Sequence, residues 1–498
     1  MKKILLININ SDDRRKNSFR LGLAYLSSAL KDYDTEIFDL NFHDDKELFL
    51  KIARNHYDVV GISCYTGVFS RATQIAKSIK EIDVRCVTVV GGYHATAEHR
   101  YIIDNHPEFD VAIIGRGEIP FVELMKNIDN LDRLSEVPQI AYKKGGTIYV
   151  NDCLHFPSSS GFIPNRNTED LYFDKDDEEK VACIATMRGC YHKCSFCSIS
   201  INDPVQIYNR NLVEMDVLNA VRNKANSLYF INPDFLSNRI CIDNTLDVLD
   251  KFPEIKTFKI STRADSILRN LEILDRLFKR GCNSIEVGIE SFSDDQLKRY
   301  NKGVTSKVNV ESYKVITELS KKYSFRYIHE IIPFDPWVSK SELKMTVDFY
   351  LNNDFDYIEI EPWLFTKLML YPMTDLRARA EQEGIINHDN RLEIPEWKFI
   401  NSDVSEIYSA LIRYKILILP RIFSLRKEID CLLEDRKNIL LVKKSLLFAL
   451  KDILSKATMI FFSKLLQNEP EQYNLLIIEE EKKINDITKK IRRIKNEY

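Results

Sequence analysis

The chain has 498 residues and a formal net charge of −3, with 71 basic residues against 74 acidic ones. A chain of this length predicts two or three domains. The near balance of charge creates no field that would draw the protein to nucleic acid, so we expect no nucleic-acid partner. No apolar run in the sequence is long enough to cross a bilayer, so we expect no membrane span.

The ten cysteines fall into two groups. Three lie close together in the middle of the chain, and the other seven stand alone, most of them beside apolar residues. Lone cysteines of this kind are usually inert core residues. Because they do not form the pattern of a disulfide framework, we expect a reducing compartment and a cytoplasmic protein. The seven are Cys64, Cys86, Cys153, Cys183, Cys241, Cys282 and Cys431.

Residues 1–130 alternate between short apolar runs and segments of helical spacing. The expected strands are residues 4–9, 36–40, 59–63, 86–90 and 111–114, and the helical patterns include residues 21–31 and 69–80. Polar residues end the first apolar run at once, so it predicts a strand and not a signal peptide. Strands that alternate with helices favour a parallel sheet covered on both faces. This series predicts a doubly wound, flavodoxin-like α/β domain, whose ligands bind at the carboxyl ends of the strands.

Glycines and polar residues follow the last three of these expected strands. Glycine lets a backbone approach a ligand closely, and hydroxyl groups offer polar contacts. The same residue types also build tight turns between a strand and a helix, so the residues alone leave both interpretations open. The candidates for ligand contact are Ser63, Thr66, Gly91, Gly92 and His94, and the last strand is followed by Gly115-Arg116-Gly117-Glu118.

Residues 131–180 read as a connector. Two β-prone runs flank Lys143-Lys144-Gly145-Gly146, which predicts a β-hairpin. A serine-rich run at 158–161 and an acidic run at 174–179 follow, and such runs are more often solvated linker than functional sites.

A second alternating series occupies residues 181–386. The expected strands are residues 181–186, 227–231, 257–261, 284–289, 325–332 and 357–360. These strand–helix units predict a curled parallel sheet, a partial (β/α)6 barrel, with its active site at the carboxyl ends of the strands. Polar side chains follow several of the strands and are candidate ligand contacts, although strand-end ion pairs and turn caps use the same residue types. The candidates are Asn232, Asp234, Arg263, Glu290 and Ser291.

The loop after the first strand of this series carries Cys190, Cys194 and Cys197, with the spacing C-x3-C-x2-C. Three thiolates in one loop can bind three irons of a [4Fe–4S] cluster and leave the fourth iron open to a small molecule, whereas four cysteines close the cluster. Two alternatives stay open at this point. The thiolates and His192 could hold a structural zinc ion in a binding module without catalysis, or the thiols could hold no metal.

This spacing, with Phe196 just before the last cysteine, resembles the radical SAM (S-adenosylmethionine) enzymes. The succession of strand ends across residues 181–386 resembles one subclass of that family, the class B-type radical SAM methyltransferases, which carry an N-terminal cobalamin-binding domain. The first domain shares four runs with that subclass: Leu21-Gly22-Leu23-Ala24-Tyr25-Leu26, Asp58-Val59-Val60-Gly61-Ile62-Ser63, Val89-Val90-Gly91-Gly92-Tyr93-His94 and Gly115-Arg116-Gly117-Glu118.

The resemblance implies three cofactors: a [4Fe–4S] cluster on Cys190, Cys194 and Cys197, S-adenosylmethionine, and cobalamin. In that family the open iron binds the amino and carboxylate groups of SAM, and an electron from the cluster cleaves a carbon–sulfur bond to give a 5′-deoxyadenosyl radical. On this basis Phe196 lies against the adenine, and Glu290 and Asp234 accept hydrogen bonds from the ammonium or the ribose.

The resemblance also implies roles for the remaining candidates. Arg263 suits the SAM carboxylate through its planar fork, Ser291 bonds the ribose or the carboxylate, and Asn232 stands where relatives often carry a second acid. The corrinoid contacts carried over are Ser63, Thr66, Gly91, Gly92 and His94. The D-x-H-x-x-G motif that binds cobalt from below is absent, so we expect cobalt without a histidine ligand below it.

Residues 387–498 show helical patterns and contain no glycine. Ile484, Ile487, Ile491 and Ile494 form a stripe at helical spacing, which predicts a packing or short coiled-coil helix. A second interpretation is a substrate-recognising cap over the barrel mouth. Four aromatic residues are weaker substrate-facing candidates, because such residues are more often core; they are Tyr93, His329, Trp337 and Tyr371.

The expected function is that of a cobalamin-dependent radical SAM methyltransferase, which acts on an unactivated carbon through the 5′-deoxyadenosyl radical and methylcobalamin. One alternative is a radical SAM enzyme that rearranges, cyclises or oxidises its substrate without methyl transfer. A methylthiotransferase fits less well, because the cysteines of the first domain stand singly and the tail is helical. We expect a small-molecule or peptide substrate and an electron donor such as flavodoxin or ferredoxin.

Overall fold

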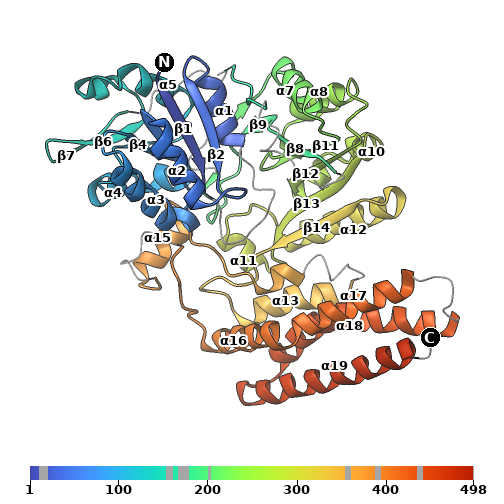
Figure 1. Ribbon diagram of the computed structural model, residues 1–498. Coiled ribbons are helices and arrows are strands. Elements are labelled where there is room, and N and C mark those ends of the chain that lie inside the picture. The colour runs from blue at the N-terminus through green and yellow to red at the C-terminus, as the bar shows by residue number, and fades with distance from the viewer. Residues whose placement is uncertain are drawn as a thin grey trace.

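The computed structural model describes residues 1–9, 21–152, 161–166, 179–199, 204–353, 361–386, 394–434 and 441–496. The expected strand at 357–360 and most of the two linker runs lie outside these residues. The described chain forms two α/β units and a C-terminal group of helices, with the first unit and the helical group at opposite ends of the molecule (Figure 1).

The first unit is built on a sheet of order β2-β1-β3-β4-β5-β6-β7, in which β1 to β5 are parallel. This is the predicted flavodoxin-like order. The strands are β1 (Lys3–Asn8), β2 (Asp34–Asp39), β3 (Val59–Ser63), β4 (Val87–Gly91) and β5 (Val111–Ile113), and the helices are α1 (Leu21–Ala29), α2 (Asp45–Asn55), α3 (Phe69–Ile82), α4 (Tyr93–Asn105) and α5 (Glu118–Asn127).

Alternation along β1 shows why this sheet is covered on both faces. Leu5 and Ile7 belong to the core layer that contains α2, α3 and α4, while Ile4 and Leu6 belong to the layer that contains α1 and α5. Successive side chains of a strand point to opposite faces, so an unbroken apolar strand needs helices on both sides.

The predicted hairpin is confirmed, and it extends the first sheet. Strands β6 (Ile140–Lys144) and β7 (Thr147–Val150) pair antiparallel, and β6 pairs antiparallel with β5. Gly145 and Gly146 have φ angles of +57° and +80°. Two residues with positive φ form the turn that matches the twist of a tight hairpin. The structure therefore places at the edge of the first sheet a hairpin that sequence reasoning assigned to the connector.

The second unit is a curved parallel sheet of order β14-β13-β12-β11-β8. Its strands are β8 (Val181–Ile184), β11 (Ser227–Phe230), β12 (Thr257–Arg263), β13 (Cys282–Glu290) and β14 (Arg326–Ile331). They correspond to the first five of the expected barrel strands. The helices between the strands include α7 (Arg210–Arg222), α8 (Arg239–Leu249), α9 (Ala264–Arg269), α10 (Leu271–Lys279), α11 (Asp294–Arg299) and α12 (Ser306–Tyr323), and α13 (Lys340–Leu351) follows the last strand.

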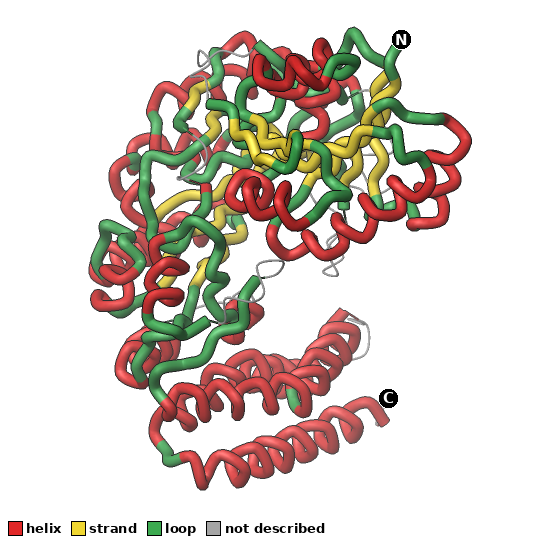
Figure 2. The backbone as a smooth tube through the Cα atoms, turned by 90° about the vertical axis from the view of Figure 1, so that its left-hand side faces the viewer, coloured by secondary structure: helices red, strands yellow, loops and turns green. Residues whose placement is uncertain are grey.

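The C-terminal helices pack on the barrel through α13. They are α16 (Ser402–Leu417), α17 (Leu419–Glu434), α18 (Leu441–Gln467) and α19 (Tyr473–Asn496), preceded by the short α15 (Asp375–Gln382). Helix α18 contacts α13, and α19 runs beside α18 (Figures 1 and 2). The predicted stripe on α19 is buried, since Ile484, Ile487, Ile491 and Ile494 all belong to the core.

One hydrophobic core runs from the barrel into this helical group. Phe334, after β14, lies 5.8 Å from Phe462 of α18, ring centre to ring centre, with the rings stacked. Tyr414 and Phe461 stack at 4.3 Å inside the helical group. None of the helices in the described parts of the chain is both long and apolar enough to cross a membrane.

Candidate functional site

The three cysteines lie in the loop that connects two short, paired strands. After β8, strand β9 (Met187–Arg188) pairs antiparallel with β10 (Gln206–Ile207), and the cysteines come directly after β9. Cys190, Cys194 and Cys197 are partly exposed, and none is in a disulfide. The amide of Cys197 donates to the carbonyl of Cys194 at 3.1 Å, so the last two cysteines share one tight turn.

The loop is fastened to other parts of the barrel through Ser195. Its amide donates to the Tyr300 carbonyl at 2.9 Å, and its hydroxyl donates to the Arg299 carbonyl at 2.8 Å. Its own carbonyl accepts from the Leu376 amide at 3.1 Å. Asn301 adds a side-chain bond to the Lys193 carbonyl at 2.7 Å. Four backbone anchors of this kind fix where the thiols point, which a cluster site requires.

A buried cationic pair lies against Cys194. Arg263, at the end of β12, donates from Nη1 to Cys194 Sγ at 3.6 Å and from Nη2 to the Lys302 carbonyl. Lys302 Nζ donates to Glu290 Oε1 at 2.6 Å. Burial raises the pKa of the Cys194 thiol, while the charges of Lys302 and Arg263 act to lower it. The two cations therefore favour the thiolate form that binds iron.

Glu290 is held in an uncommon backbone conformation at the end of β13. Its φ angle is +60°, in the left-handed region that non-glycine residues rarely adopt. A Cβ on the nearby Gly288 would come within 2.8 Å of Glu290 Oε1 and 3.0 Å of Lys302 Nζ. The Glu290–Lys302 pair thus needs a glycine beside it, and strain of this type is often found at functional sites.

Asp234 is fully buried at the end of the second barrel strand. Its carboxylate accepts hydrogen bonds from Thr262 and Ser266, each at 2.7 Å, and lies 3.3 Å from His192 Nε2. Burial alone would raise the pKa of Asp234, but the hydrogen bonds from His192, Ser266 and Thr262 hold it below its ordinary value. The side chain of His192 is therefore engaged with Asp234, which argues against its use as a zinc ligand with the cysteines.

Three other candidates, Asn232, Ser291 and Phe196, contact neighbouring residues of the protein. Asn232 is buried and exchanges two hydrogen bonds with Thr186, at 3.1 and 2.7 Å. Ser291 Oγ accepts from the Ser293 amide at 2.9 Å. The Phe196 ring packs edge-to-face on Tyr300, with ring centres 5.4 Å apart. In the part of the chain that the structure covers, no three His, Cys, Asp or Glu side chains converge closely enough for a single metal ion.

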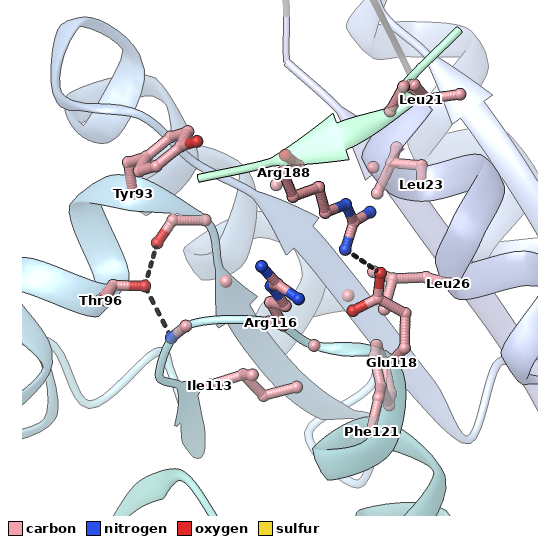
Figure 3. A pocket seen from close by; sticks show the side chains of 18 of the residues that line it. Leu21, Leu23, Leu26, Tyr93, Thr96, Ile113, Arg116, Glu118, Phe121 and Arg188 are labelled. Carbon is pink, nitrogen blue, oxygen red and sulfur yellow. Dashed lines mark hydrogen bonds and ion pairs between the residues drawn. The ribbon is translucent and has the colours of Figure 1, made fainter. Parts of the chain in front are cut away.

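A cavity of about 370 Å³ lies between the two α/β units (Figure 3). Residues from the carboxyl ends of β3, β4 and β5 form one side, and residues 187–189 before the first cluster cysteine form part of the other. No residue of the described C-terminal helices lines it. The lining residues from the first unit include Gly22, Leu23, Leu26, Ser63, Gly91, Gly92, Tyr93, Gly115, Arg116 and Glu118.

The structure separates the five corrinoid candidates into two groups. Ser63, Gly91 and Gly92 line the cavity, whereas Thr66 and His94 do not. His94 Nδ1 lies 3.3 Å from Thr66 Oγ1, and its ring packs on Phe69 with centres 4.5 Å apart. Burial lowers the pKa of His94 to about 4. Both residues are therefore part of the packing between β3 and α4 and not of the cavity wall.

Two glycines leave part of the cavity wall open. Among the described residues, no atom beyond the neighbouring residues and the helix backbone lies within 4 Å of the place where a Cβ on Gly22 would stand, and a Cβ on Gly91 would only reach Ile113 at 3.9 Å. The absent side chains leave open space that faces the cavity, and leucines and isoleucines form much of the remaining wall. A large ring system with an apolar face, such as a corrinoid, fits this surface.

Some cavity residues were not selected from the sequence as candidates. Arg116 and Glu118 belong to a run that carried the family resemblance, and Arg188 stands two residues before the first cluster cysteine. Their charged side chains reach the cavity, where Arg188 Nη1 donates to Glu118 Oε1 at 2.6 Å (Figure 3). Lys302 was likewise overlooked. The sequence signal that could have identified these residues was their position within or next to a motif that had already been singled out.

Known protein families and relatives are similar to this chain over both α/β units. The model of the B12 binding domain matches residues 12–125, and the model of the radical SAM superfamily matches residues 184–349. A protein of Pyrococcus horikoshii named as an uncharacterized methyltransferase, PH0819, is 26% identical over 379 residues, which cover 74% of this chain and 79% of that protein.

A second relative is the anaerobic magnesium-protoporphyrin IX monomethyl ester cyclase of Cereibacter sphaeroides, 25% identical over 322 residues. The match covers 59% of this chain and only 51% of the cyclase, so the chain spans about half the length of that relative. Among solved structures, the cobalamin-dependent S-adenosylmethionine radical enzyme OxsB, with aqua-cobalamin and S-adenosylmethionine bound, superposes with a TM-score of 0.76 at 17% identity. That superposition covers 100% of this chain and 81% of OxsB, and it shows a shared fold.

The barrel and its three-cysteine loop define the class: this is a radical SAM protein. The chain belongs to the radical SAM proteins that carry a B12-binding domain ahead of the barrel, and these two domains imply a [4Fe–4S] cluster, S-adenosylmethionine and cobalamin as cofactors.

Proposed function

We propose that this protein is a cobalamin-dependent radical SAM methyltransferase that acts on an unactivated carbon. The observation that carries the proposal is the shared cavity, whose wall comes from the strand ends of the B12-binding domain on one side and from the segment before Cys190 on the other. When bound, the cluster with SAM supplies a 5′-deoxyadenosyl radical and the corrinoid supplies a methyl group. A ligand in this cavity would touch both units, as transfer between the two cofactors requires.

The side chains around the cluster loop have roles that their contacts support. Cys190, Cys194 and Cys197 would hold the cluster. Arg263 and Lys302 would stabilise it by placing positive charge beside Cys194, where a thiolate is needed. We infer that Arg263 acts mainly on the cluster loop, because its three donor nitrogens already bond Cys194, Asp265 and Lys302.

Five further residues are proposed to serve S-adenosylmethionine directly or through a neighbour. Asp234 and Glu290 bring carboxylates to the carboxyl ends of the strands, where the ammonium and ribose of SAM need acceptors. Asn232 and Ser291 would act by shaping the adjacent turns, since each is already bonded to a neighbouring residue. The partly buried Phe196 would offer its ring to the adenine.

The cavity also suits chemistry that water would quench. Its wall is mainly apolar, and an apolar wall excludes water from a reactive radical. For partners we propose a small-molecule or peptide substrate and an electron donor such as flavodoxin or ferredoxin. A cytoplasmic location is also proposed, because the described cysteines are all free thiols, as in a reducing compartment.

A second candidate function is radical cyclisation or rearrangement without methyl transfer. It is favoured by the likeness to the anaerobic magnesium-protoporphyrin IX monomethyl ester cyclase. Both candidates use the same cluster and the same cavity. They differ in product mass, because methyl transfer adds one methylene to the substrate.

The test is anaerobic reconstitution with iron, sulfide and cobalamin, followed by addition of SAM to the reduced protein. We expect retention of one corrinoid per chain and methylation of the reduced corrinoid by SAM, seen in the absorption spectrum. Cys194→Ala should lose the cluster, and Cys431→Ala, at a cysteine far from the motif in the sequence, is the matched control and should keep it. A protein that holds its cluster but retains no corrinoid would refute the methyltransferase proposal.

A further inference from the structure

A buried ion pair bridges the two α/β units at the cavity. Arg188, on β9, donates from Nη1 to Glu118 Oε1 at 2.6 Å, and Glu118 is the first residue of α5. Only 18% of the Arg188 side chain and 7% of the Glu118 side chain are exposed. Figure 3 shows the two side chains meeting in the cavity wall. Ion pairs buried to this degree are far more costly to break than surface pairs.

The planar face of the Arg188 guanidinium also packs against an aromatic ring. Its central carbon lies 4.3 Å from the centre of the Tyr25 ring, which belongs to α1 of the first unit. Tyr25 in turn stacks on Tyr208, just after β10, with ring centres 6.3 Å apart and planes 8° from parallel. Arg188 therefore contacts the first unit through a carboxylate and an aromatic face together, which restricts its position more than either contact alone.

Arg116 makes a second connection in the opposite direction. It belongs to the first unit, and it donates from Nη2 to the Pro204 carbonyl at 2.7 Å and from Nη1 to Gln206 Oε1. Gln206 is the residue that pairs with Arg188 in the β9–β10 ribbon. Residues 115–118 of the first unit thus contact both strands of the β9–β10 ribbon on either side of the cluster loop, β9 through Glu118 and β10 through Arg116.

This ribbon is close to the cluster along the chain. Arg188 is two residues before Cys190, and two residues span at most about 7 Å of extended backbone. The other end of the connection is the loop at residues 115–118, which lines the cavity. A displacement at either end would change the distance between a ligand in the cavity and a cluster on Cys190.

We infer that Arg188, Glu118 and Arg116 form an interdomain strut that sets the separation between bound corrinoid and cluster. The three are positioning residues, because they act through the cofactors that they hold apart. This inference rests on the proposed function, since it assigns the cavity to the corrinoid.

The test is a distance measurement on the protein loaded with both cofactors. Reduced [4Fe–4S] cluster and cob(II)alamin are both paramagnetic, so the magnetic coupling between them in electron paramagnetic resonance reports their separation. We expect one well-defined coupling in the parent protein. Glu118→Gln and Arg188→Met should each broaden or shift that coupling at parental iron and corrinoid content, and the double variant should do no more than either single variant.

Asn165→Ala is the matched control. Asn165 donates from Nδ2 to Ser27 Oγ at 3.2 Å and from its amide to the Ala24 carbonyl, so it also fastens the connector to α1, but it is not a cavity residue. The coupling should be unchanged in this variant. If Glu118→Gln loses corrinoid, Glu118→Asp keeps the charge and shortens the side chain, and it should retain both cofactors with a shifted coupling.

The outcomes separate the two proposals. A parental coupling in Glu118→Gln and Arg188→Met, or in Glu118→Asp where that variant is needed, would overturn the strut and leave the proposed function intact. Failure of the parent protein to retain corrinoid would overturn both.

Discussion

Gly22 provides the sharpest test of the cavity as the corrinoid site. It is an exposed residue of α1 that lines the cavity, and in the described parts of the chain no atom beyond its neighbours and the helix backbone lies within 4 Å of the position that its Cβ would occupy. The folded protein can therefore accept at least a methyl group there without a clash. A bound ring system that fills the same space would clash with it. Substitution at this position should separate the stability of the protein from its affinity for corrinoid.

The expected magnitudes follow from helix propensity and packing. Glycine within a helix costs about 0.5–1 kcal/mol relative to alanine, so Gly22→Ala should leave the apoprotein as stable as the parent or up to about 1 kcal/mol more stable. Overpacking a filled site by one methyl group costs about 1–3 kcal/mol, which corresponds to roughly 5- to 150-fold weaker corrinoid binding. Gly22→Phe should abolish retention of corrinoid.

The assay compares thermal unfolding of the apoprotein with corrinoid retained after gel filtration. Ser28→Ala is the control, since it lies on the same helix, raises helix propensity and does not line the cavity. It should bind corrinoid like the parent. The reasoning would be refuted by a Gly22→Phe protein that is folded and still retains corrinoid at the parental stoichiometry.

Three other predictions concern the cluster, the buried ion pair between Glu290 and Lys302, and the pH dependence of stability. Cys190→Ala should leave a folded protein with a strongly reduced content of cluster iron and sulfide after anaerobic reconstitution; a parental content would contradict the assignment. Lys302→Met should destabilise the cluster-free protein by about 3–5 kcal/mol, because it leaves the carboxylate of Glu290 buried and unpaired, and Glu290→Gln in the same chain should recover part of that loss in thermal unfolding. Burial lowers the pKa of His94 to about 4 and that of His329 to about 3. Both values lie below the ~6.5 of an unfolded histidine, so the folded state binds fewer protons. Stability that is complete above about pH 6.5 should then fall as the pH drops, by up to ~1.4 kcal/mol per pH unit for each histidine. Denaturant midpoints at about pH 7 and pH 5 would check this, and an unchanged midpoint would contradict it.

Much of the architecture could be predicted because its signals are local. The apolar strand at residues 4–9 is followed by a helical pattern, and this alternation recurs through both α/β units. The pair Gly145-Gly146 specifies a hairpin turn within two residues. What local signals did not reveal is that the hairpin joins the first sheet, because pairing with β5 depends on which sheet edge lies nearby in the folded chain.

The sequence predicted which residue types stand at the strand ends of the candidate site, but not which atoms their side chains contact. His94 follows a strand end as a ligand would, yet it packs against Phe69 and Thr66 beneath the surface. Arg263 has the chemistry for a SAM carboxylate, yet it bonds Cys194 and the Lys302 carbonyl. A strand end brings a residue to the correct edge of a sheet, and the packing of neighbouring loops then decides which atom it meets.

The amino-acid sequence by itself determined that three thiols meet in one loop, since the three cysteines lie within eight residues. It also determined the order of the two α/β units, through the period of their apolar residues. Only the tertiary structure decided that the two units share one cavity and that Glu118 meets Arg188, 70 residues further along the chain. Such a pair forms only where the two units pack together, and no local pattern in the sequence indicates that residues 70 positions apart will meet.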